Sequence, residues 1–124
     1  MSFTSWRRRE SEKQLRARDA NEATAEALTA PPACEGVDSF VCECGDRGCS
    51  RAIGLTLAEY RSVRANATHF AIARDHENPE SERVITETER FAVIETVSPE
   101  ATKLARRSDP RWGRAQRTVG VGHS

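Results

Sequence analysis

The chain has 124 residues, of which 37% are hydrophobic and 31% are charged, and its formal net charge is zero. This length allows one domain at most, and the composition is more polar than that of an average globular domain. The sequence has no apolar run of about 18 residues, which excludes a membrane-spanning helix, and its arginine-rich start lacks the apolar segment of a secretory signal.

Charge is distributed unevenly along the chain. Residues 1–30 hold six basic and five acidic residues, residues 31–102 hold seven and thirteen, and residues 103–124 hold six and one. An acidic middle argues against a dedicated nucleic-acid-binding core, although the Arg-rich end could bind nucleic acid. Without an export signal we expect a cytoplasmic protein, whose thiols stay reduced.

The first segment, residues 1–31, is predicted to be a polar helix. It is rich in Arg, Glu, Ala and Gln, and no Gly or Pro occurs before Pro31. Leu15 and Leu28 are its only large aliphatic residues after the first turns. So weak an apolar stripe favours a solvated helix over one that packs on a partner.

The folded unit is predicted over residues 38–107, where most apolar residues lie. Short strands are expected at Phe40–Cys42 and Ala52–Leu55. Thr56, followed three residues later by an acid, matches a capping box, which predicts a helix over Leu57–Ala65.

Three more strands follow in the prediction. Alternating apolar residues predict a strand at His69–Ala73, with Phe70 and Ile72 on one face. Val84–Glu87 and Phe91–Glu95 are predicted to form a hairpin.

The last predicted helix begins at Ser98 and Pro99, which suit the N-cap and first helical positions, and it should end near Arg107. Residues 108–124 are predicted to be a disordered basic tail. Together the elements predict an α+β fold. A small antiparallel sheet packs on one central helix, next to a cysteine-rich zinc knuckle, and a helix flanks it at each end.

Three cysteines, Cys42, Cys44 and Cys49, lie within eight residues. Cys42 and Cys44 point to the same face of a strand, and the Gly-Asp-Arg-Gly insert supplies a turn that brings Cys49 back to them. Three converging thiolates predict a zinc site. An iron–sulfur centre, a redox dithiol and buried free cysteines are the alternatives, but the usual ferredoxin and CxxC spacings are absent.

A tetrahedral zinc site needs a fourth ligand. We prefer His76, because a loop residue that follows a strand can approach the cysteines. His69, at the start of that strand, is second, and Cys34, in the Pro-rich loop, is third. The chain lacks an HExxH element, so we predict no catalytic residues and not an enzyme.

Several linked blocks between Phe40 and Glu95 resemble a family of short bacterial proteins, frequent in actinobacteria, with the pattern FVCECGDxGC…IxLTxxEYxxVR…THF…HE. The resemblance implies no function, but it pairs the cysteine knuckle with the histidine at position 76. This chain has Arg74-Asp75 where the family has Pro-Gly. A glycine would ease a tight turn there, so we expect Asp75 to fit the turn less well.

These observations lead to one main functional hypothesis and two alternatives. The main hypothesis is a small non-enzymatic module that holds a structural zinc ion and acts in regulation through a protein partner. The first alternative is a nucleic-acid-associated regulator that uses the basic termini. The second is a thiol-based redox or metal sensor.

Overall fold

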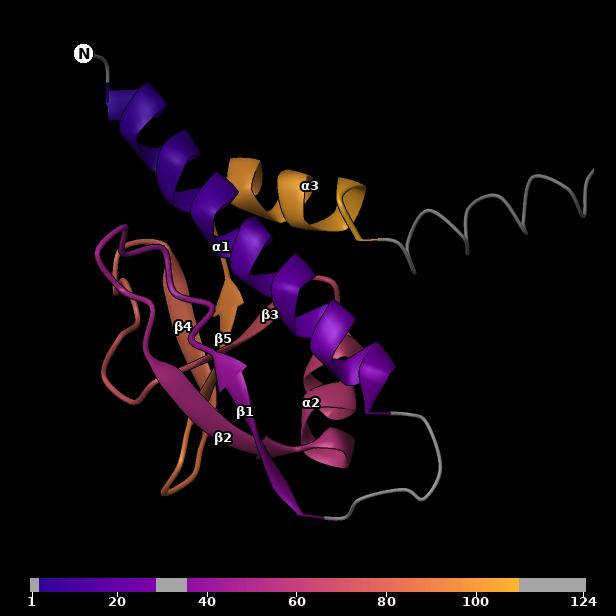
Figure 1. The fold of residues 1–124 in the computed structure, drawn as a ribbon. Coiled ribbons are helices and arrows are strands. Elements are labelled where there is room, and N and C mark those ends of the chain that lie inside the picture. The colour runs from indigo at the N-terminus through magenta and orange to yellow at the C-terminus, as the bar shows by residue number, and fades with distance from the viewer. Residues whose placement is uncertain (1–2, 29–35, 110–124) are drawn as a thin grey trace, which may run out of the picture.

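The computed structural model describes residues 3–28 and 36–109. Cys34 and the greater part of the predicted tail, from Pro110 onward, lie outside the described residues. The elements follow one another in the order α1 (Phe3–Ala27), β1 (Val37–Val41), β2 (Ala52–Thr56), α2 (Leu57–Arg64), β3 (His69–Ile72), β4 (Glu82–Glu87), β5 (Ala92–Thr96) and α3 (Pro99–Arg107) (Figure 1).

The strands form two small antiparallel sheets. β1 and β2 pair as a hairpin in which Phe40 lies opposite Ile53. The second sheet has the order β3-β5-β4, with Phe70 and Val84 both opposite Ile94 of the central strand. The predicted α+β class and all five predicted strands are therefore confirmed, with the strands divided between two sheets.

Both predicted helix starts are confirmed by their capping contacts. The Thr56 hydroxyl accepts a hydrogen bond from the Glu59 backbone N–H at 3.1 Å, and the Thr56 N–H donates to the Glu59 carboxylate at 2.8 Å. Ser98 caps α3 by accepting from the Ala101 N–H at 3.4 Å. These contacts depend only on neighbours in the sequence, which is why the pattern predicted them.

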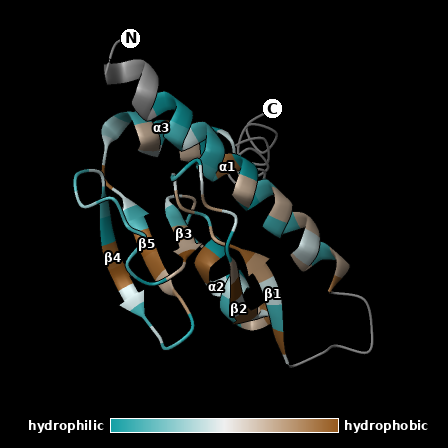
Figure 2. Cartoon of the chain, turned by 60° about the vertical axis from the view of Figure 1, so that its left-hand side comes forward, coloured by the Kyte–Doolittle hydropathy of each residue, from teal (hydrophilic) through white to brown (hydrophobic). Residues whose placement is uncertain are grey.

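The apolar core lies between the two sheets, α2 and the inner face of α1. Hydrophobic residues gather in the strands and α2, whereas α1 is largely hydrophilic (Figure 2). Tyr60 and Val63 of α2 are buried, and the Tyr60 ring stacks on Phe40 with centroids 4.7 Å apart. Phe70 and Ile94 fill the centre of the second sheet.

The expectation that the N-terminal helix is solvated is wrong. α1 crosses the body of the molecule, next to β1, α2 and α3 (Figure 1). Its buried residues are Gln14, Ala17, Arg18, Asn21 and Ala25. Three of these five side chains are polar, so the helix docks by hydrogen bonding. An apolar periodicity does not detect that mode of docking.

Arg18 connects α1 to the loop after α2 and to α3. Its side chain is fully buried and donates to the backbone carbonyl of Ala67, after α2, at 2.9 Å and to that of Ala105 in α3 at 3.1 Å. Its guanidinium carbon also lies 5.3 Å from the centre of the Phe70 ring. The side chain thus orders α1 against both the sheet and α3.

A second buried arginine, Arg64 of α2, connects the two ends of the described chain. It forms ion pairs with Glu22 of α1 and with Asp109, whose carboxylate oxygen is 2.8 Å away. Asp109 is only 3% exposed, so the chain is held at the point where α3 ends. Removing one partner of such a buried ion pair leaves the charge of the other partner uncompensated.

Asn21 uses both ends of its amide to hold the end of β1. Its Nδ2 donates to the Val41 carbonyl at 2.7 Å and to Glu43 at 2.9 Å, and its Oδ1 accepts from the Val41 N–H at 2.8 Å. We expect Asn21→Ala to lower the free energy of unfolding by about 2–4 kcal/mol, because it leaves these buried partners unsatisfied. Urea denaturation followed by circular dichroism measures this loss.

The matched control is Arg16→Ala, on the exposed side of the same helix. It should change the free energy of unfolding by no more than about 0.5 kcal/mol. Equal effects of the two substitutions would contradict the docking of α1 through Asn21.

Candidate metal centre

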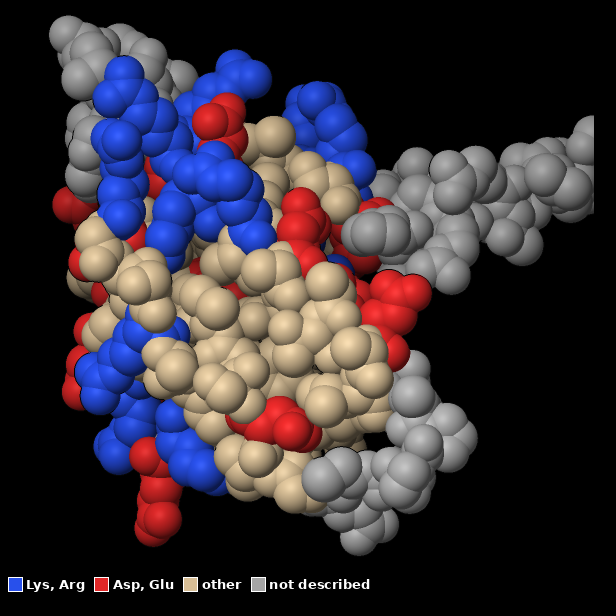
Figure 3. Space-filling model, viewed as in Figure 1, with Lys and Arg blue, Asp and Glu red and all other residues tan. Residues whose placement is uncertain are grey.

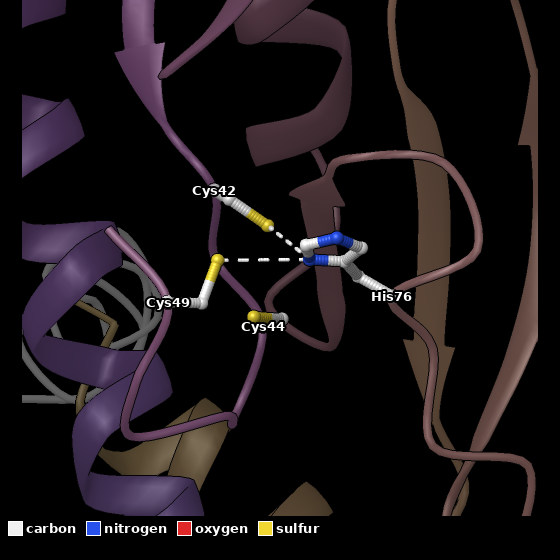
Figure 4. A group of neighbouring side chains, drawn as sticks. All are labelled: Cys42, Cys44, Cys49 and His76. Carbon is white, nitrogen blue, oxygen red and sulfur yellow. Dashed lines mark hydrogen bonds between the residues drawn. The ribbon is translucent and has the colours of Figure 1, made fainter. Parts of the chain in front are cut away.

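The cysteine knuckle is the connection between the two strands of the first hairpin. Cys42 and Cys44 follow β1, and Cys49 lies shortly before β2. His76 comes from the loop between β3 and β4, and its ring points toward the sulfur atoms (Figure 4). Two segments distant in sequence therefore meet at one point.

The four side chains are close enough to share one ion. The Nδ1 atom of His76 lies 3.7 Å from the Cys42 sulfur and 3.6 Å from the Cys49 sulfur. Together with the Cys44 sulfur, these ligand atoms all lie within 4.8 Å of one another. The group can hold a metal ion.

The separations agree with tetrahedral zinc. Zinc binds thiolate sulfur at about 2.3 Å and imidazole nitrogen at about 2.0–2.1 Å, so two such ligands at the tetrahedral angle lie roughly 3.6 Å apart. The two Nδ1–sulfur distances match this value. The donor set thus fits zinc by its chemistry, and the two Nδ1–sulfur distances fit zinc by their length.

The structure also distinguishes the candidate fourth ligands. His69 lies apart from the cluster, with its Nε2 atom 3.3 Å from a carboxylate oxygen of Glu95 on the neighbouring strand. Cys34 lies outside the described residues. Among the described residues, His76 is the histidine that approaches the three sulfur atoms.

The turn that returns Cys49 to the cluster is formed by the predicted Gly-Asp-Arg-Gly insert. The Asp46 carboxylate accepts from the Gly48 N–H at 2.9 Å, and the Asp46 carbonyl accepts from the Cys49 N–H at 3.0 Å. Gly45 lies against α1. A β-carbon at this position would be 3.1 Å from the Glu10 β-carbon, which is closer than side chains normally approach.

Hydrogen bonds and charge stabilise thiolates in the cluster. The Ala73 N–H donates to the Cys42 sulfur at 3.1 Å, and the Lys13 ammonium of α1 lies 3.9 Å from the Cys44 sulfur. Without a metal, a hydrogen bond between the two thiol groups raises the pKa of Cys42 and lowers the pKa of Cys44, because the Cys42 proton is shared with the Cys44 thiolate. A metal ion bound by both sulfur atoms would take the place of that proton.

Glu43 is a residue of the site whose structural role the sequence reasoning did not identify. It lies between two candidate ligands and is fully buried. Its carboxylate accepts from Asn21 at 2.9 Å, from the Tyr60 hydroxyl at 2.6 Å and from the Ala71 N–H at 2.9 Å. Burial raises the pKa of Glu43, and these three hydrogen bonds oppose that shift.

The only sequence signal for this role is the placement of an acid inside the cysteine segment. In an alternating strand, the residue between Cys42 and Cys44 points to the opposite face. That face is the interior here, where Asn21 and Tyr60 receive the carboxylate. Both partners are distant in sequence, so the pattern alone did not indicate them.

The turn that leads into His76 requires a left-handed residue. Asp75 has φ 68°, and it is the one non-glycine residue with positive φ in the described part of the chain. The expectation that glycine would suit this turn better than Asp75 is confirmed by the positive φ of its backbone. His76 nevertheless reaches the sulfur atoms. Aspartate is among the residues that tolerate this conformation best.

We expect Asp75→Gly to raise the free energy of unfolding by about 0.5–1 kcal/mol, because glycine adopts positive φ without steric cost. Thermal melts of the two proteins measure the difference. Asp75→Val is the contrasting variant and should be less stable than the parent, since a β-branched residue is strained at positive φ. A stabilising valine would contradict this explanation.

Of the described helices, none combines the length and apolar character needed to cross a membrane. Comparison of the chain with protein-family models, with curated proteins and with solved structures finds no match. The function is therefore argued from the site itself.

Proposed function

We propose that the protein is a small non-enzymatic module in which Cys42, Cys44, Cys49 and His76 bind a structural zinc ion. The observation that carries this proposal is the convergence of the four ligand atoms within 4.8 Å of one another. Three thiolates and an imidazole favour zinc, whereas calcium and magnesium prefer oxygen ligands.

A structural role is supported by the number of ligands. Four protein ligands complete a tetrahedral shell, while catalytic zinc sites keep one position for water or substrate. Cys42 and Cys44 are fully buried. Zinc with three thiolates also keeps one net negative charge, which the neighbouring Lys13 ammonium offsets.

A structural ion suits the position of this site in the fold. It would join the β1–β2 hairpin to the loop after β3, and these belong to two different sheets. The sheets are small, with two and three strands, and a bound metal commonly stabilises a domain with a limited core.

We further propose that the module acts in regulation through a protein partner. Support comes from β4, an edge strand of the second sheet on which Val84 and Ile85 are exposed. The open edge of a sheet can pair with an extended segment of another chain.

The purified protein should contain zinc in an equimolar amount, as measured by atomic emission. Removal of zinc with a chelator should unfold the domain or lower its melting temperature sharply. A structural zinc ion contributes several kcal/mol, and total stability of a domain is only about 5–15 kcal/mol. Zinc-free protein with an unchanged melting curve would contradict the structural role.

Two histidine variants test the ligand assignment. His76→Ala should lose zinc and the stability that depends on it. His69→Ala is the matched control, because His69 contacts Glu95 and lies outside the cluster, and it should retain zinc. Zinc loss in the His69 variant alone would overturn the assignment of the fourth ligand.

A thiol-based sensor is the second candidate function, and the exposure of the site favours it. Cys49 is only half-buried, unlike Cys42 and Cys44, which are buried. A cavity of about 520 Å³, lined in part by Gly45, Asp46 and His76, adjoins the cluster at its histidine. A small oxidant therefore has access to the site.

In a sensor, hydrogen peroxide would oxidise the Cys49 thiolate to a sulfenic acid, and a second thiolate would displace hydroxide to form a disulfide. The metal would lose two ligands. We then expect a zinc-responsive dye to report zinc release under mild peroxide, and dithiothreitol to restore zinc binding. Zinc that stays bound under peroxide would leave only the structural role.

A further inference from the structure

Two basic segments from opposite ends of the chain form one surface. Lys and Arg side chains gather over the first half of α1 and over α3, with few acidic residues among them (Figure 3). The exposed cations of this basic surface are Arg8, Arg9, Arg16, Lys103, Arg106 and Arg107. They come from two helices that contact each other directly.

The tertiary structure brings these residues together. Arg18 of α1 donates to the Ala105 carbonyl of α3, and the ion pair between Arg64 and Asp109 holds the end of α3. The two inward arginines are held by buried partners, whereas the six cations of the basic surface are exposed. The fold thus gathers exposed positive charge from two helices that are distant in sequence.

A groove lies within the basic surface between the two helices. It has a volume of about 340 Å³, and Arg8, Lys103 and Arg107 line it together with one acid, Glu100. The Nε atom of Arg8 lies 3.3 Å from a carboxylate oxygen of Glu12, in an exposed ion pair within α1. Exposed pairs of this kind contribute little, so a stronger anion can displace the carboxylate.

We propose that the basic surface of α1 and α3 binds the phosphodiester backbone of nucleic acid without regard to sequence. Cations from two helices flank the groove on both sides, which suits a chain of regularly spaced anions. Residues 110–124, which continue from α3, add three arginines and no acid.

Nucleic acid fits this surface better than a membrane does. A helix that lies in a membrane needs a large exposed apolar face. Ala17 and Ala25 of α1 are instead buried, Leu15 is partly buried against the core, and the exposed apolar residues among those described in this helix are alanines. Of the residues that line the groove, only Leu104 is a large aliphatic.

The test is fluorescence anisotropy of the zinc-loaded full-length protein with a labelled DNA duplex of random sequence and with its single strand. We expect dissociation constants of about 10⁻⁴–10⁻⁶ M near physiological salt. The logarithm of affinity should fall linearly with the logarithm of salt concentration, as counterion release requires. Absence of binding at low salt would overturn the proposal.

The decisive variant removes one cation from each helix, Arg8→Gln with Arg107→Gln. The salt slope should decrease by about 2, one unit for each lost phosphate contact. The matched control, Arg51→Gln with Arg61→Gln, removes the same charge from exposed positions elsewhere and should leave the slope unchanged. Both pairs lie on the surface, and unchanged zinc content and melting temperature verify their folding.

Three results would overturn the proposal. The first is an equal loss in the control pair, which would indicate a response to net charge alone. The second is loss of binding only when Arg111, Arg114 and Arg117 are replaced by Gln, which would assign binding to the tail. The third is tighter binding to anionic lipid vesicles or to polyglutamate than to DNA, which would identify a membrane or an acidic protein as the partner.

Discussion

The buried carboxylate of Glu43 is the interaction on which the arrangement of the other elements depends. One fully buried side chain receives hydrogen bonds from α1 through Asn21, from α2 through Tyr60 and from β3 through Ala71. A buried charge is costly unless donors surround it, so each of these three elements must keep its place for the carboxylate to be satisfied. The charge thereby fixes one geometry where the small core alone would be less specific.

Glu43 also connects the fold to the metal centre. It lies between Cys42 and Cys44, so the backbone that positions its carboxylate also positions two sulfur atoms. Lys13 of α1 donates to the Cys44 carbonyl at 2.8 Å, and Gly45 allows the knuckle to approach the same helix. The same contacts therefore dock α1 and position the metal ligands.

The polar docking of α1 has a consequence for the outer surface. The helix directs Gln14, Arg18 and Asn21 inward, where each finds a specific acceptor or donor. Arg8, Arg9 and Arg16 of the same helix are exposed, as are the basic residues of α3. A chain with zero net charge can thus present a surface dominated by one sign, because tertiary packing sorts the charges that the sequence mixes.

The sequence by itself determined what depends on near neighbours. The N-caps of α2 and α3 and the β4–β5 hairpin follow from local hydrogen bonds and from apolar spacing, and the three cysteines lie close together in the chain. Tertiary structure alone decided that His76 rather than His69 meets the sulfur atoms, that α1 docks, and that Glu43 is buried. Each of these results depends on partners far away in the sequence, and hydrogen bonds between polar side chains leave no periodic trace in it.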